Sequence, residues 1–140
     1  RRVIAEKVVI DTNTALDFLV FEDPGVQALY EAVTRGATQW LVCPPMRVEL
    51  ARVLDYPLVA KRREARTRSV SDVMQRFDTL ATSVAVAPKA VFTCKDPDDQ
   101  VFIDLAVAHA AALYSKDHAV LALKGRLARL GIAVIKPAPR

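Results

Sequence analysis

The sequence predicts an α/β fold in which a mostly parallel sheet is covered by helices on both faces. Short apolar or β-branched runs alternate with helical patterns from one end of the chain to the other. Hydrophobic residues make up 52% of the chain and are mostly Ala, Val and Leu, which suits helices packed on a buried sheet. The 140 residues contain no repeat or low-complexity linker, so residues 1–140 are expected to form a single domain.

The first part of the chain is expected to form two strands, at residues 7–11 and 39–43, because each is a short apolar run bounded by turn-forming residues. Helices are expected at residues 15–20, 26–33 and 46–54. A cap within residues 12–14 begins the first helix, Gly36 ends the second, and Pro45 suits the first turn of the third. The apolar positions of the third helix are Val48, Leu50, Ala51 and Leu54.

The middle of the chain is predicted to be helical and then to return to the sheet. Residues 58–82 are expected to form two helices broken near Ser69, with Ser69 or Ser71 as the cap. A third strand is expected at residues 83–87, where a β-branched run ends at Pro88.

The last part of the chain resumes the alternation of helices and strands. A polar loop at residues 95–98 leads to a strongly helical stretch at 99–113. Its apolar face is built from Phe102, Ile103, Ala106 and Ala110. Strands are expected at 113–115 and 132–135, separated by one or two helices within 119–130 that Gly125 divides.

Composition narrows the functional classes. No apolar stretch is long enough to span a bilayer and no secretory signal is recognisable, so a soluble cytoplasmic protein without membrane contact is expected. Cys43 and Cys94 have no zinc-binding or redox spacing. The chain also lacks the glycine-rich and nucleophile motifs GxGxxG, GxxxxGK and GxSxG.

The positive charge is concentrated in one segment. The net charge is +4, and residues 61–68 hold five basic residues and one acid, so this segment accounts for the whole excess. On charge alone a solvated helix face is the favoured interpretation. The alternative is a patch for nucleic-acid phosphates or an acidic partner.

Four carboxylates map to one edge of the predicted sheet, where the carboxyl ends of parallel strands meet the amino ends of the following helices. They are Asp11 after the first strand, Glu49 near the start of the third helix, Asp99 at the start of the long helix, and Asp117 after the fourth strand. Each alone could cap a helix, and Glu49 could pair with Arg52. Together they would repel one another unless a cation neutralises them, so a site for Mg²⁺ or Mn²⁺ is predicted. Such an ion can activate water for attack on a phosphodiester.

The residues around these acids resemble the PIN domain family, in particular the bacterial PIN-type toxins of toxin-antitoxin operons. The resemblance covers nearly the whole chain and rests on four segments: Val8 to Asn13, Val48 to Leu54, Cys94 to Ala106, and Ser115 to Asp117. It implies a three-layer α/β/α fold and a Mg²⁺- or Mn²⁺-dependent ribonuclease that cuts single-stranded or structured RNA. It further implies a cognate antitoxin protein and a homodimer as partners.

The resemblance also implies roles for individual residues. Asp11, Glu49, Asp99 and Asp117 would be the catalytic, metal-binding acids, with Asn13 and Ser115 as polar support. Asp104 lies five positions beyond Asp99, about 7.5 Å further along a helix and rotated away, so Asp99 is preferred as the ligand. Additional contributions from Asp96, Asp98 and Asp104 stay open. Arg62, Arg63 and Arg66 could contact RNA phosphates or the antitoxin.

Two other functions are compatible with parts of the sequence. A phosphatase that forms an aspartyl-phosphate also begins from an Asp after the first strand, but Asn13 stands where its second acid would be needed. The main alternative is a PIN-like domain that binds RNA or a protein without cutting, although the presence of all four acids favours an active enzyme.

Overall fold

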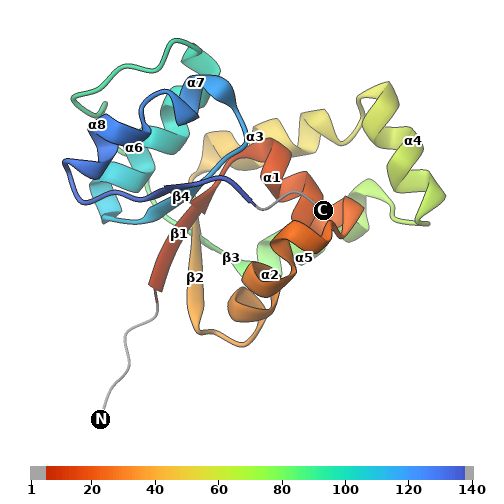
Figure 1. The fold of residues 1–140 in the computed structure, drawn as a ribbon. Helices are drawn as coiled ribbons and strands as arrows, with labels where there is room; N and C mark the ends of the chain where they lie inside the picture. The colour runs from red at the N-terminus through yellow and green to blue at the C-terminus, as the bar shows by residue number, and fades with distance from the viewer. Residues whose placement is uncertain (1–5, 138–140) are drawn as a thin grey trace.

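The computed structural model describes residues 6–137 and contains a five-stranded sheet in the order β3-β2-β1-β4-β5, with every neighbouring pair parallel (Figure 1). The strands are β1 (Glu6–Ile10), β2 (Thr38–Val42), β3 (Ala81–Ser83), β4 (Ala112–Tyr114) and β5 (Val134–Ile135). Because β1 lies in the middle, its residues Val8, Val9 and Ile10 are buried by elements on both sides. The predicted α/β fold with a parallel sheet is confirmed.

Helices cover both faces of this sheet. The elements between β1 and β3 are α1 (Thr12–Leu16), the π-helical η1 (Asp17–Phe21), η2 (Pro24–Val26), α2 (Gln27–Thr34), α3 (Pro44–Val53), α4 (Pro57–Ala65) and α5 (Val70–Leu80). After β3 come η3 (Pro97–Asp99), α6 (Gln100–His109), α7 (His118–Leu121) and α8 (Lys124–Ala128). Figure 1 shows α6, α7 and α8 on one side of the sheet and α2 and α5 on the other. The result is a three-layer α/β/α arrangement.

Strand order explains why the helices divide in this way. The chain crosses the sheet in one direction from β1 to β3, and then in the opposite direction from β4 to β5. Right-handed crossovers therefore place the two groups of helices on opposite faces. On the face of α2 and α5, the Trp40 ring packs edge-on against Phe18 and Phe77, with ring centroids 5.2 and 5.1 Å apart.

The third strand is shifted from its predicted position at residues 83–87. β3 pairs with β2 from Trp40–Ala81 to Val42–Ser83. Beyond Val42 the neighbouring chain turns into α3 through Pro44, so residues after Val84 have no strand beside them to continue the ladder. Only Ser83 of the predicted strand therefore lies in β3, because the end of β2 limits how far the two strands can pair.

The boundaries of the last helices also differ from the prediction. α6 ends at His109 and not at residue 113, because Ala110 adopts a left-handed conformation with φ 52° and β4 then pairs with β1 from Ala112. Ala110 is consequently exposed and does not belong to the core. The break between α7 and α8 falls at residues 122–123 and not at Gly125, which places Val120, Leu123 and Leu127 together in the core.

The third predicted helix begins earlier than residue 46 and exposes one of its predicted apolar positions. Pro44 and Pro45 occupy the first turn of α3, where their missing N–H groups cost nothing. Leu50 and Leu54 are buried, whereas Val48 is 64% exposed. Within residues 6–137, no helix combines the length and apolar character needed to cross a bilayer.

Candidate active site at the carboxyl end of the sheet

The predicted acids meet where the direction of the strand order reverses. β1 and β4 are neighbours, but the chain leaves β1 towards one face and leaves β4 towards the other. This divergence opens a crevice at the carboxyl ends of the two strands, which is the usual ligand position in open parallel sheets. Asp11 follows β1, and Ser115 to Asp117 follow β4.

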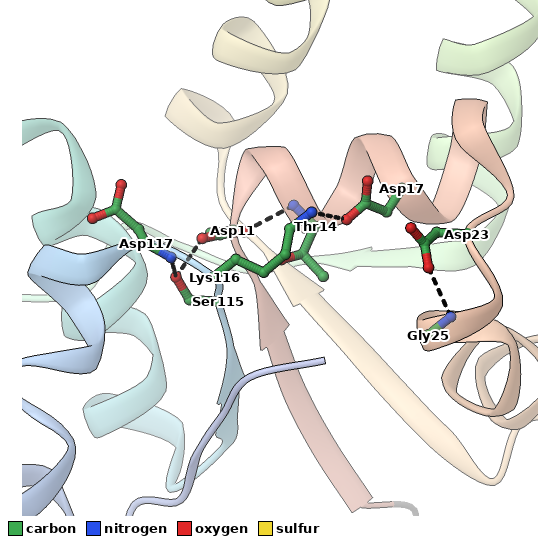
Figure 2. Close-up of polar contacts among 8 residues, drawn as sticks. All are labelled: Asp11, Thr14, Asp17, Asp23, Gly25, Ser115, Lys116 and Asp117. Carbon is green, nitrogen blue, oxygen red and sulfur yellow. Dashed lines mark hydrogen bonds and ion pairs between the residues drawn. The ribbon is translucent and has the colours of Figure 1, made fainter. Parts of the chain in front are cut away.

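Asp11 is held by two hydrogen bonds and is 3% exposed. Its Oδ1 accepts from the Thr14 backbone N–H at 2.9 Å, and its Oδ2 accepts from the Ser115 hydroxyl (Figure 2). The residue that caps the first helix is therefore Asp11 itself, and not one of residues 12–14. Oδ1 caps the helix and Oδ2 is held by Ser115, while Asp11 still lines the cleft, so the structural and chemical interpretations of Asp11 are compatible.

Ser115 links the two strand ends. It is fully buried, donates to Asp11, and accepts from the Asp117 backbone N–H at 3.0 Å (Figure 2). Asp117 in turn caps α7, because its Oδ1 accepts from the Ala119 N–H at 2.8 Å. One serine hydroxyl thus joins the Asp11 carboxylate to the backbone of Asp117.

Asp99 has an unpaired buried oxygen and a raised pKa. Its Oδ2 is buried and has no hydrogen-bond partner among the described residues. Burial, followed by repulsion from Asp117 and Asp96, raises the pKa of Asp99 from 3.8 to about 7. An acceptor without a donor in a field of like charges is a position that a hard cation would satisfy.

Three carboxylates form the tightest group. Asp96, Asp99 and Asp117 each offer an oxygen within 4.8 Å of the others, which is close enough for one ion to contact all three. All three ligand atoms are carboxylate oxygens, which is the donor set that Mg²⁺ and Mn²⁺ prefer. The residues present therefore fit a divalent metal, with Asp96 in a place that the sequence left open.

Glu49 reaches the same crevice from α3. Burial is the main cause that raises the pKa of its carboxyl group, while the Thr12 side chain and Arg52 act in the opposite direction. Asp98 and Asp11 add smaller upward contributions, which shows that the Glu49 carboxylate lies within their electrostatic reach.

The crevice is a cleft of about 300 Å³ that collects all four predicted acids. It is also lined by the predicted polar residue Asn13, which is exposed, and by Asp98. Two residues of this cleft were not recognised from the sequence as part of the site, namely Arg52 and Tyr56. For Arg52 the available signal was its spacing from Glu49, because positions three residues apart on a helix lie on the same face. Tyr56 lies beyond the end of α3, so helix spacing does not account for it.

Asp104 lies outside the cleft. Its Oδ1 accepts from the Ala90 N–H and from the Gln100 side chain, both at 2.8 Å. Asp104 thus joins the loop before η3 to α6 through Oδ1, and it is not among the residues that line the cleft.

The three arginines expected to contact RNA or an antitoxin differ in accessibility. Arg63 is 8% exposed and donates to the carbonyl oxygens of Leu54 and Arg68, at 3.3 and 3.0 Å. Its guanidinium group therefore joins α3 to the turn after α4, and it does not fit the expected contact role.

The other two arginines, Arg62 and Arg66, are exposed. Arg62 stacks over the Phe21 ring at 3.7 Å, and Arg66 donates to the Phe21 carbonyl oxygen at 3.3 Å. They therefore pack partly on η1 while remaining open to solvent.

Fold and site together define a parallel α/β protein with a carboxylate cleft suited to a divalent cation. A family model described as PIN domain matches residues 7–119, and the chain therefore belongs to the PIN domain family, as its sequence motifs predicted. Among curated proteins, none matches the chain by sequence. Among solved structures, the crystal structure of VapBC2 from Rickettsia felis bound to a DNA fragment from their promoter contains a similar chain. The TM-score is 0.62 at 10% sequence identity, covering 93% of this chain and 98% of that one, so the likeness concerns the fold.

Proposed function

We propose that this protein is an endoribonuclease that depends on Mg²⁺ or Mn²⁺ and acts as the toxin of a toxin-antitoxin pair. The observation that carries the proposal is the buried, unpaired oxygen of Asp99. It lies within a cluster of acids at the crevice between the carboxyl ends of β1 and β4. Membership of the PIN domain family supports nuclease chemistry at this position. The toxin role is supported by the fold shared with a chain of the VapBC2 complex.

Each acid has a proposed part in the site. Asp11, Asp99 and Asp117 would hold the metal, with Glu49 on the opposite wall and Asp96 as a further ligand from the tight group. When bound, the ion would supply an activated water and stabilise negative charge on the phosphodiester. Ser115 would keep the Asp11 carboxylate in place, and Asn13 would offer a polar contact at the mouth of the cleft.

The substitution Asp11→Asn tests this proposal. The amide oxygen of Asn can still accept from the Thr14 N–H, so α1 should remain capped and the protein folded. The lost charge should reduce RNA cleavage by more than about 100-fold, since altering even the groups that orient metal ligands costs 10- to 100-fold. Cleavage of a mixed RNA substrate and Mn²⁺ binding by calorimetry are the measurements.

Asp23→Asn is the matched control. Asp23 caps η2 by accepting from the Gly25 N–H at 2.8 Å, in the same way that Asp11 caps α1, but it lies outside the cleft (Figure 2). Its substitution should leave cleavage and Mn²⁺ affinity unchanged. RNA binding without any cleavage at saturating Mn²⁺ would overturn the proposal in favour of a non-cleaving PIN domain.

Partners and location follow from the proposed role. We expect a cognate antitoxin to bind this protein, two copies to form a homodimer, and both to act in the cytoplasm. An antitoxin would be encoded beside the toxin, and co-purification of the two products, followed by a mass measurement of the complex, tests these expectations.

A further inference from the structure

The loop after β4 is joined to the segment after β1 by two consecutive residues. Ser115 donates to the Asp11 carboxylate, and Lys116 forms an ion pair with Asp17 (Figure 2). Asp11 and Asp17 are the N-cap and C-cap of α1, about 9 Å apart along the helix axis. The loop is therefore held at both ends of this helix, directly before the position where it supplies Asp117 to the acidic cleft.

Asp17 differs from the other acids that form ion pairs within residues 6–137. Its side chain is 9% exposed, whereas the side chains of Glu22, Asp55 and Asp78 in the other pairs are 49–74% exposed. Exposed pairs restrain the chain little, because water solvates both charges. A carboxylate that is largely removed from water depends on its partner instead, so the contact with Lys116 should restrain the loop strongly.

The backbone of Asp17 is also held in place. Its N–H donates to the carbonyl oxygens of Asn13 and Thr14, and its carbonyl oxygen accepts from the Glu22 N–H. These bonds join the end of α1 to the π-helical turn η1, a kind of turn that frequently occurs at functional sites. Lys116 is therefore anchored on a buried, hydrogen-bonded position of the fold and not on a freely moving surface side chain.

The ion pair also determines where the positive charge of Lys116 lies. Although Lys116 directly precedes an acid of the cleft, it is not among the residues that line the cleft. Figure 2 shows its side chain extending from the loop towards Asp17 and away from Asp117. An ammonium group beside the acids would compete with a metal ion for them, so Asp17 keeps that charge away from the cleft.

We propose that Lys116 and Asp17 are positioning residues of the metal site, because their ion pair holds the loop against α1 and so keeps Asp117 in place for a divalent ion. The inference rests on the proposed metal-dependent function and extends it to residues outside the cleft. Neither residue lines the cleft, so both act through the loop and not by contact with the ion. Groups that orient metal ligands in this indirect way commonly change metal affinity by about 10- to 100-fold.

Amide hydrogen exchange of the metal-free protein, followed by NMR, tests the restraint on the loop. Lys116→Met removes the charge and keeps a long side chain. The N–H groups of Asp117 and Ala119, which are hydrogen-bonded within the loop and its cap, should then exchange roughly 5- to 30-fold faster, as expected for one lost interaction. The Gly25 N–H is the matched control, because Asp23 holds it at 2.8 Å in the same kind of cap (Figure 2).

Calorimetry with Mn²⁺ alone, without RNA, tests the consequence for the site. Lys116→Met and Asp17→Asn should each weaken Mn²⁺ binding by about tenfold, the lower end of the range for groups that orient metal ligands. Lys124→Met alters an exposed lysine of α8, and Arg63→Ala removes a structural contact outside the cleft. Both control variants should bind Mn²⁺ as the wild type does.

A double variant separates the position of the loop from the stability of the protein. Lys116→Met combined with Asp17→Asn leaves no unpaired carboxylate at this place, so part of the lost stability should return. The loop still lacks its anchor, so Mn²⁺ binding should remain about tenfold weaker than in the wild type. An affinity that recovers together with the stability would overturn the inference.

The outcomes distinguish this inference from the proposed function. Unchanged Mn²⁺ affinity in the Lys116 and Asp17 variants, with or without faster exchange, would overturn the inference and leave the ribonuclease standing if the wild type cleaves RNA. Faster exchange and weaker Mn²⁺ binding in a protein that never cleaves RNA would support the inference and overturn the ribonuclease. A wild type that binds no Mn²⁺ would overturn the metal site and the inference together.

Discussion

Asp99 shows how one residue reports the chemistry of its surroundings. Acids at the start of helices are common and stabilising, and Asp99 caps α6 by position, yet its side chain makes no capping hydrogen bond. One of its oxygens is buried without a donor, next to Asp117 and Asp96. An unpaired buried oxygen costs stability, and the proposed metal ion would offset that cost by binding it.

The raised pKa of Asp99 predicts how the stability of the metal-free protein depends on pH. Because the pKa rises from 3.8 to about 7 on folding, the folded state binds a proton that the unfolded state lacks between about pH 4 and 7. The free energy of unfolding should therefore fall as pH rises through this window. Urea unfolding in EDTA at pH 5, 6, 7 and 8 measures the trend, to which Glu49 contributes in the same direction.

Asp99→Asn is the matched control for this pH dependence. The variant has no titrating group at this position, so its free energy of unfolding should decline less steeply between pH 5 and 8 than that of the wild type. Identical slopes for the two proteins would show that Asp99 titrates near its ordinary value.

At the scale of elements, a basic side chain joins the loop after β4 to η1. Lys116, in the loop after β4, forms an ion pair with Asp17 of η1 (Figure 2). The Asp17 side chain is 9% exposed, so the lysine neutralises a carboxylate that solvent barely reaches. This contact ties the loop carrying Ser115 and Asp117 to the helical segment that follows Asp11.

Removing Lys116 should therefore destabilise the protein. Lys116→Met should lower the free energy of unfolding by about 1–3 kcal/mol, because it leaves the Asp17 carboxylate unpaired. Adding Asp17→Asn should recover part of that loss, which a double-mutant cycle of urea unfolding would show as a coupling energy. Lys124→Met, at an exposed position on α8, is the control, and a double variant no more stable than Lys116→Met would argue against the pairing.

Arg62 and Arg63 are adjacent on helix α4, but we expect them to contribute unequally to the stability of the protein. Arg63→Ala should cost about 2–4 kcal/mol, because it removes the donors for the Leu54 and Arg68 carbonyl oxygens together with a buried aliphatic stem. Arg62→Ala loses one exposed stacking contact on Phe21 and should cost less than about 1 kcal/mol. Thermal and urea unfolding of both variants check the order, and equal losses would contradict the structural role of Arg63.

At the scale of the whole molecule, the proposed metal site predicts that stability depends on divalent metal. If the cleft binds an ion only when folded, metal at 100 times its Kd should stabilise the protein by about 2.7 kcal/mol. For a chain of this length the Tm should rise by roughly 5–10 °C. Melting with Mn²⁺ and with EDTA at pH 8 measures the shift, and Asp99→Asn should show little of it. An equal shift in wild type and variant would place the ion elsewhere.

Much of the fold was predictable because it depends on local patterns. The apolar run from Val8 to Ile10 is typical of a strand covered on both faces, and Pro45 suits the first turn of a helix. The positions of Asp11 and Asp117 after strands were therefore readable, together with the edge of the sheet where they meet. The ends of β3 and α6 were harder to predict, because they depend on where the neighbouring strands pair.

The sequence by itself determined the order of strands and helices along the chain, because this order follows from hydrophobic periodicity. It also determined the four acids expected at one edge, because the carboxyl ends of parallel strands meet there. Only the tertiary structure decided which side chains are free. It placed Arg63 in the interior and Arg52 in the cleft, brought Asp96 beside Asp99, and left Tyr56 exposed. These differences depend on how the folded backbone turns, which decides the groups that lie within reach of each side chain. No pattern of residue types encodes which of two neighbouring arginines will find carbonyl partners.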